Sequence, residues 1–185
     1  MESNPEATGR TKEAFDDFRS YLSNPRMPTA ALIANRDQVK QMNPSDGLLL
    51  WRDGPVTTKQ KPPVAPLVTK DQADTAQLWA VRTEDVAYAE ERCAFGKSLE
   101  SGVIKHTNLT GGLPAFCGGE LIFIDESTIV VNGNSGRYGP RGSDEMRLVA
   151  QAFAKSGYKV WSMGFDHEAD LPAPFIGSYP EWIPA

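Results

Sequence analysis

The sequence predicts an α+β domain with a mixed or mostly antiparallel sheet and two packed helices, preceded by a short helical N-terminal extension. Two observations carry this prediction. The apolar runs GELIFID (119–125) and TIVVNG (128–133) lie on either side of the turn residues 125–127, which is typical of a hairpin. Apolar residues then recur at helical spacing from Ser143 to about Gly157, before a last strand-like run at 158–166.

The helical N-terminal extension is predicted over residues 1–53. Apolar residues spaced by three and four positions predict one helix over 11–22 and a second over 28–42. The run LLLW (48–51) predicts a short buried strand. A proline-rich connector follows at 54–77, and its composition fits either a flexible linker or a strap that packs on the domain.

The α+β core domain is predicted over residues 78–185. LWAVR (78–82) has the composition of a strand. Thr83 is a favourable N-cap for a helix that ends near Gly96, because carboxylates follow it in the first turn. The run VIKHTNL (103–109) then predicts a strand with polar residues at alternate positions.

The composition is that of an acidic protein with an ordinary apolar content. The 185 residues carry a net charge of −5, and the sequence pI of about 5.1 argues against a nucleic-acid partner. No run approaches the roughly 20 apolar residues that cross a bilayer, so no membrane association is expected. The first residues lack a secretory signal pattern, so we expect a cytoplasmic location, with signal-less export left open.

The cysteine and histidine content points away from disulfide and metal sites. Cys93 and Cys117 do not form a CxxC pair and are expected to be buried thiols. His106 and His167 are scattered relative to them, so we predict no metal site.

Residues 102–142 contain nine of the sixteen glycines and most of the side chains able to do chemistry. Glycine loses more backbone freedom on folding than any other residue, so such a cluster indicates sharp turns or close approach to another group. Within this stretch we expect His106 to act as an acid or base, with Thr107 and Asn108 beside it binding substrate. The alternative for His106 is a histidine hydrogen-bonded to a neighbouring strand.

Glu120 is the predicted carboxylate of the site. Alternation in GELIFID places it on one face with Ile122 and Ile124, where desolvation favours proton transfer. The alternative is a solvated glutamate at a strand end.

The segment SGRYGPRGS (135–143) is the most specific local signal. Arg137, Arg141 and the helix start at Ser143 together offer donors suited to phosphate or carboxylate. Tyr138 is expected to orient the reacting group as a third catalytic residue. The alternative is a structural loop in which Arg137 pairs with a carboxylate such as Glu120 or Asp166.

The blocks IKHTNLTGG, GGELIF and NGNSGRYGP resemble an uncharacterised bacterial domain family, over about residues 78–170. They are also similar to C-terminal domains of some secreted toxin or effector proteins, through His106-Thr107, Gly119-Glu120 and the motif SGRY (135–138). A His-Thr pair and a Glu on separate strands resembles ADP-ribosyltransferases, which implies NAD as a cofactor or substrate. The fuller motifs of those enzymes are missing here.

These features predict a small enzyme, a transferase or hydrolase, that acts on an anionic nucleotide- or phosphate-bearing substrate, with NAD as one candidate. The alternative is a non-catalytic binding module, such as an immunity protein, an adaptor or a ligand sponge. The expected partner is a small anionic ligand, and a protein partner is left open.

Overall fold

The computed structural model of the protein describes residues 9–57 and 60–184. Within these residues, seven strands form one sheet in the order β1-β3-β2-β4-β5-β6-β9, and β7 pairs separately with β8. The strands are β1 Leu49–Leu50, β2 Gln77–Val81, β3 Val86–Glu90, β4 Cys117–Phe123, β5 Thr128–Asn132, β6 Lys159–Ser162, β7 Phe165–Asp166, β8 Leu171–Pro172 and β9 Glu181–Ile183. Neighbouring strands run antiparallel except for the parallel pair β5 and β6, so the predicted α+β fold with a mostly antiparallel sheet is confirmed.

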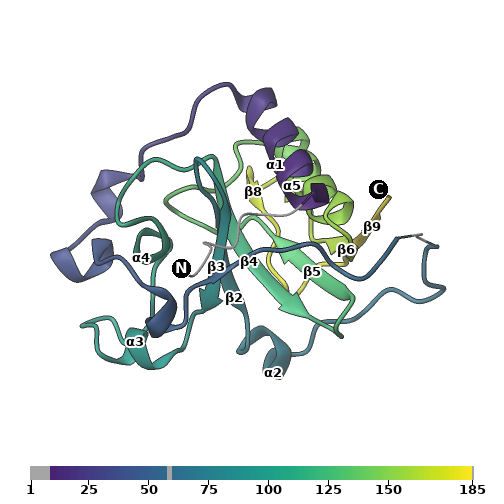
Figure 1. The fold of residues 1–185 in the computed structure, drawn as a ribbon. Helices are drawn as coiled ribbons and strands as arrows, with labels where there is room; N and C mark the ends of the chain where they lie inside the picture. Colours follow the sequence, from purple (N-terminus) through teal and green to yellow (C-terminus); the bar gives the residue numbers. More distant parts are fainter. Residues whose placement is uncertain (1–8, 58–59, 185) are drawn as a thin grey trace.

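Helices cover both faces of the sheet. The α-helices are α1 Gly9–Leu22, α2 Lys70–Ala73, α3 Ala94–Lys97, α4 His106–Thr110 and α5 Ser143–Lys155. Figure 1 shows α1 lying beside α5 on one side of the sheet, with α3 and α4 on the side of β2 and β3. Helix α5 connects β5 to its parallel neighbour β6, as a parallel crossover requires.

The main core lies between the sheet and the pair α1 and α5. Phe153 of α5 is at its centre, with ring centroids 5.1 Å from each of Phe15, Trp51 and Trp79. These edge-on contacts suit the charge distribution of aromatic rings. Because Phe15 belongs to α1, part of the predicted N-terminal extension is built into the same core.

The opposite face of the sheet carries two apolar clusters. One surrounds Leu78 and Ile104 and packs under α4, and the other surrounds Ile122 and Trp161. Side chains alternate along β4, so Leu121 faces the main core whereas Ile122 faces away from it, as predicted. Between the two clusters the same face of β4 carries Glu120.

The predicted helix that starts at Thr83 is wrong. Residues 86–90 form β3, which pairs with both β1 and β2. Arg82 closes the preceding turn, because its Nε donates to Asp85 Oδ1 at 2.6 Å. Short apolar runs fit either helical or strand spacing. Here the backbone hydrogen bonds to β1 and β2 stabilise the strand.

The predicted strand at 103–109 is also wrong, because residues 106–110 form α4. The Asn108 side chain accepts a hydrogen bond from the Lys105 backbone N–H at 2.7 Å and stabilises the start of the helix. Gly111 ends the helix with a φ of +66°, a left-handed conformation that glycine adopts readily.

The predicted helix over 28–42 is replaced by 3₁₀ turns. These cover Ala30–Leu32 and Arg36–Val39, and a further turn covers Pro44–Asp46. None of the residues in the three turns is buried, so no apolar stripe holds a regular helix against the domain. In the predicted connector, Val64 and Leu67 are exposed and Val68 is buried.

Candidate functional site

The loop from β5 to α5, residues 133–142, is the segment that the sequence marked as an anion site, and we call it the arginine loop. It leaves the carboxyl end of β5 and turns tightly, because the Gly139 N–H donates to the Ser135 carbonyl at 2.9 Å. A Cβ at Gly139 would lie 2.5 Å from that carbonyl oxygen, so the turn requires glycine.

The arginine loop borders a cavity of about 410 Å³, which we call the arginine groove. Its other walls come from residues 26–29 and from 165 and 170–172. Among the described residues, three arginines, Arg26, Arg137 and Arg141, line it together with one carboxylate, Asp170. In a chain with a net charge of −5, this groove is therefore a local site of positive charge.

Two of these arginines already have partners. Arg26 Nη2 lies 3.0 Å from Glu145 Oε2 and donates to the Phe116 carbonyl. Arg137 Nη2 donates to the Leu32 carbonyl at 2.5 Å and to Gln38 Oε1 at 2.7 Å. The buried Nε of Arg137 has no hydrogen-bond partner among the described residues.

Arg141 differs from the other two because its side chain is exposed. Its backbone N–H donates to Glu145 Oε2 at 2.8 Å, which fixes the backbone beside the groove. Across residues 9–57 and 60–184, no hydrogen bond or ion pair involves its guanidinium. Within the described part of the chain, Arg141 is thus the groove arginine whose guanidinium has no partner.

Tyr138 anchors the arginine loop to α4. Its side chain is 1 % exposed, and its hydroxyl lies 2.7 Å from the Leu113 carbonyl and 2.8 Å from Thr110 Oγ1. Burial raises the pKa of the phenol, so it stays protonated at neutral pH. These contacts give Tyr138 a structural position at the groove wall.

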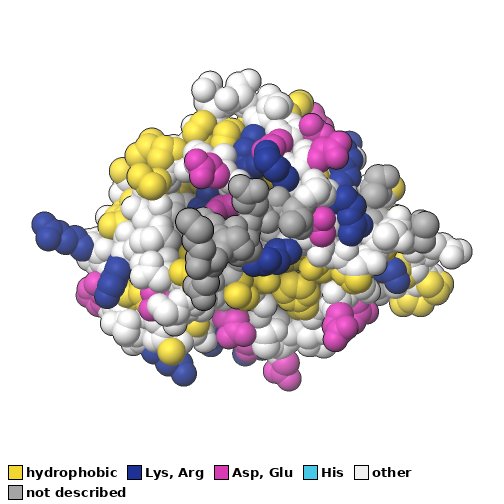
Figure 2. Space-filling model, in the orientation of Figure 1, with side chains coloured by type: hydrophobic (Ala, Val, Ile, Leu, Met, Phe, Trp, Pro, Cys, Tyr) yellow, Lys and Arg dark blue, Asp and Glu magenta, His cyan; other side chains and the backbone are white. Residues whose placement is uncertain are grey.

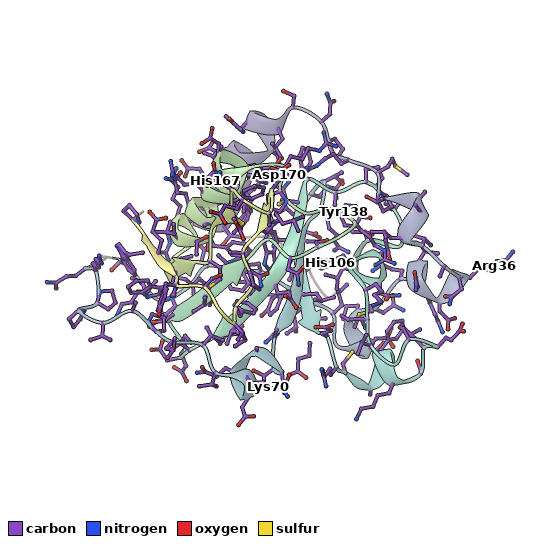
Figure 3. All side chains as sticks on the ribbon, turned by 180° about the vertical axis from the view of Figure 1, so that it is seen from behind. Arg36, Lys70, His106, Tyr138, His167 and Asp170 are labelled. Carbon is purple, nitrogen blue, oxygen red and sulfur yellow. The ribbon has the colours of Figure 1, made fainter. Side chains whose placement is uncertain are left out.

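His106 lies in α4 against the sheet, below the arginine loop (Figure 3). Its Nε2 lies 2.8 Å from the Gly119 carbonyl oxygen, and the side chain is 6 % exposed. A carbonyl only accepts, so Nε2 carries the hydrogen. Burial lowers the pKa of His106 to about 4, which leaves a neutral imidazole at pH 7. This is the geometry of the alternative, a histidine bonded to a neighbouring strand.

Thr107 and Asn108 are completely buried, and their side chains donate hydrogen bonds to the 3₁₀ turn at Arg36–Val39 and to the residue after it. The Thr107 hydroxyl donates to the Gln38 carbonyl. Asn108 Nδ2 donates to the carbonyls of Asp37 at 2.8 Å and Lys40 at 2.9 Å. Neither residue lines the arginine groove.

Glu120 belongs to a polar strip on the sheet face opposite the main core. The strip consists of Glu91, Lys105, Glu120, Asn132 and Asn134. Glu120 Oε1 accepts from Asn132 Nδ2 at 3.2 Å and from Asn134 Nδ2 at 3.0 Å. Burial and the neighbouring Glu120 carboxylate raise the pKa of Glu91. Glu91 is not among the predicted site residues, because the sequence pattern predicts a helix over residues 83–96 and gives no sign that Glu91 lies beside Glu120.

Ser143 is the first residue of α5 and borders a second cavity, not the arginine groove. The N-cap is Gly142, which makes no side-chain capping bond. The Glu145 carboxylate instead accepts from the Arg141 N–H and places a negative charge at this helix end.

The structure therefore separates the eight predicted site residues. Arg137, Tyr138 and Arg141 line the arginine groove, whereas His106 and Glu120 do not. His106, Glu120 and Arg137, predicted to act together on one substrate, thus do not all line the arginine groove. In Figure 3, Tyr138 lies near His106, and Asp170 of the groove lies on the segment between β7 and β8.

Comparisons of the chain with protein-family models, with curated proteins and with solved structures find no match. The resemblance to a bacterial domain family and to toxin or effector domains stays a prediction. Among the described residues, no helix has the length and apolar character needed to span a membrane. No three His, Cys, Asp or Glu side chains in this part of the chain form a metal-binding group.

Proposed function

We propose that the protein binds a small anionic ligand, of the nucleotide- or phosphate-bearing class, in the arginine groove. The observation that carries this proposal is Arg141, an exposed guanidinium without a side-chain partner in the described structure, on the wall of a cavity that contains two further arginines. A guanidinium offers forked donors that match phosphate oxygens.

The size and lining of the groove fit a nucleotide. Its volume of about 410 Å³ falls within the roughly 300–1,000 Å³ range of small-molecule sites. Met27 and Leu171 line it and are 65 % and 60 % exposed, and Phe165 contributes a ring. These apolar surfaces would contact a base while Arg141 binds phosphate.

A nucleic-acid ligand fits the surface less well than a small molecule. On the face shown in Figure 2, Lys and Arg side chains are interspersed with Asp and Glu side chains and do not form one continuous basic surface. Nucleic-acid binding needs several aligned cations to neutralise phosphates. A small nucleotide needs only the local charge of the groove and is available in the cytoplasm, the location we propose.

Isothermal titration of the full chain with inorganic phosphate, ADP, ADP-ribose and NAD tests the proposal. We expect at least one nucleotide to bind, and Arg141→Ala to weaken it about tenfold or more, as for loss of a charged hydrogen bond of about 1.5–3 kcal/mol. Arg36→Ala is the matched control, because Arg36 is exposed and lies far from the groove (Figure 3). Absence of binding at millimolar concentration would overturn the proposal.

A catalytic function is the second candidate, and the polar strip favours it. Glu91 and Glu120 interact, and the pKa of Glu91 is raised, as in carboxylate pairs that divide acid and base roles. In this candidate, Glu120 acts as acid or base in a transferase or hydrolase, with NAD as one substrate to test.

Turnover separates the two candidates. Release of nicotinamide from NAD, or of phosphate from ADP, is measured with the unmodified chain and with Glu120→Gln. A catalytic protein loses turnover in Glu120→Gln while its ligand affinity persists. Ligand binding without any turnover in the unmodified chain leaves a binding module, such as an immunity protein, adaptor or ligand sponge.

A further inference from the structure

A second cavity, which we call the β6 cavity, lies at the carboxyl end of β6. It has a volume of about 200 Å³ and lies where the start of α5, the end of β6 and the edge strand β9 meet. The parallel strands β5 and β6 both end at this edge of the sheet, and α5 begins there. The volume is below the roughly 300 Å³ of sites for drug-sized molecules, so only a ligand of few atoms fits.

Two opposite charges border this cavity without pairing with each other. Arg147 lies one helical turn after Ser143 on α5, and Glu181 lies on β9, directly opposite Ser162 of β6. Both side chains are exposed. Neither takes part in an ion pair or side-chain hydrogen bond within the described residues.

A buried hydroxyl at the cavity adds an independent observation. Ser162 is 2 % exposed and lines the cavity. Its Oγ accepts a hydrogen bond from the Gly164 N–H at 3.1 Å, but its own hydrogen has no acceptor in the described part of the chain. A buried donor without an acceptor carries a desolvation cost that a ligand oxygen would remove.

The remaining walls combine apolar residues with Ser143, His167 and Tyr179. Met163 and Ile183 are buried beside the cavity, and Phe165 stacks edge-on with His167 at a centroid distance of 5.9 Å. The cavity thus combines a cation, an anion, a short apolar wall and a buried hydroxyl whose hydrogen has no acceptor within the described residues.

We propose that the β6 cavity binds a small zwitterion with a carboxylate and an ammonium group, that is, a free α-amino acid. Arg147 and the Ser162 hydroxyl receive the carboxylate, Glu181 receives the ammonium group, and Met163 and Ile183 contact an apolar side chain. The Glu181 carboxylate would repel a simple anion, and Arg147 would repel a simple cation. A zwitterion instead has one attractive interaction with each of the two side chains.

Titration of the full chain with each of the twenty L-amino acids tests this proposal. We expect the highest affinity for amino acids with apolar side chains, among them L-leucine. Two fragments of leucine isolate the charges: 4-methylpentanoate keeps the carboxylate without the amine, and 3-methylbutylamine keeps the amine without the carboxylate. Each fragment is expected to bind about tenfold or more weakly than leucine.

Variants assign the binding to the β6 cavity. Arg147→Ala and Glu181→Gln are each expected to weaken amino-acid binding about tenfold or more, whereas Arg36→Ala leaves it unchanged. All three positions are exposed, so the variants keep the thermal unfolding midpoint of the unmodified chain.

This proposal is tested separately from nucleotide binding in the arginine groove, although Phe165 borders both cavities. Arg141 does not line the β6 cavity, so Arg141→Ala retains amino-acid binding. Absence of binding by all twenty amino acids overturns the proposal. Equal affinity for leucine and for either fragment, or unchanged affinity in Arg147→Ala and Glu181→Gln, also overturns it.

Discussion

The Nε2 atom of His106 lies 2.8 Å from the carbonyl oxygen of Gly119, and this contact joins helix α4 to strand β4. Gly118, the neighbouring residue, makes room for the ring, because a Cβ there would lie 3.1 Å from His106 Cδ2. His106, which the sequence predicts to be an acid or base, is therefore a buried hydrogen-bond donor that joins α4 to β4.

The His106 contact predicts a specific dependence of stability on pH. The folded protein holds the pKa of His106 at about 4, below the ordinary value of 6.5, so the unfolded chain binds more protons between these values. Stability from this residue is present above pH 6.5 and is lost as pH falls toward 4, by about 3 kcal/mol.

Urea unfolding of the unmodified chain and of His106→Gln measures this effect. The difference in unfolding free energy between the two proteins is expected to be constant above pH 7 and to shrink as pH falls below 6.5. Parallel curves over the whole range from pH 4 to pH 8 would show that the imidazole is not buried in its neutral form.

Gly119 is expected to tolerate no side chain. A Cβ at this position would lie 2.1 Å from the Asn132 carbonyl oxygen and 2.6 Å from Trp79 Cζ2, both in the interior. Gly119→Ala should therefore cost about 3 kcal/mol or more in unfolding free energy. Gly142→Ala is the control, because a Cβ there meets nothing within 4 Å, and its cost should be below about 1 kcal/mol. Similar losses in the two variants would argue against the close strand packing at Gly119.

The ion pair of Arg26 and Glu145 connects the N-terminal part to the start of α5. Their side chains are 14 % and 10 % exposed, so removing one partner leaves a charge with little access to water. Glu145→Ala should cost about 3 kcal/mol, measured by chemical unfolding. Asp144→Ala removes an exposed carboxylate from the same helical turn and should cost less than about 1 kcal/mol. A Glu145→Ala variant as stable as Asp144→Ala would contradict the structural role of the pair.

Glu91 is expected to destabilise the folded protein at neutral pH. Burial and Glu120 raise its pKa, so the folded state favours the protonated form. The protonated Glu91 side chain adds to the unfolding free energy below the ordinary pKa of 4.5. This contribution is lost as pH rises through the raised pKa of Glu91 in the folded protein. Glu91→Gln should therefore raise the unfolding midpoint at pH 7 and leave it nearly unchanged at pH 4. A lower midpoint in Glu91→Gln at pH 7 would contradict the interaction with Glu120.

Local sequence signals predicted the parts of the fold in which neighbouring residues decide the conformation. Two apolar runs on either side of a short turn predicted the hairpin of β4 and β5, and helical periodicity predicted α5. The strand β3 depends on ladder bonds to β1 and β2, which no local pattern reveals. Helix α4 depends on the Asn108 side chain and on docking against the sheet.

The candidate site is also predicted only in part, because local sequence identifies its residues but tertiary contacts decide which of them are available to a ligand. The glycines and arginines of residues 135–141 were recognised from composition, and two of the arginines do line a groove. The partners of Arg137 are Leu32 and Gln38, which are 105 and 99 positions away in the chain. Only the tertiary structure shows that Arg137 binds them, whereas the Arg141 guanidinium has no partner among the residues that the structure describes.

A titration of the isotope-labelled full chain with ADP, followed by amide chemical shifts in NMR spectra, tests the central claim most directly. We expect the largest shifts on residues 135–141, on Met27 and on Asp170 and Leu171, and we expect Arg141→Ala to need about tenfold or more ADP for the same shifts. Shifts confined to the polar strip around Glu120, or spectra that ADP, ADP-ribose and NAD all leave unchanged in parallel titrations, would contradict anion binding in the arginine groove.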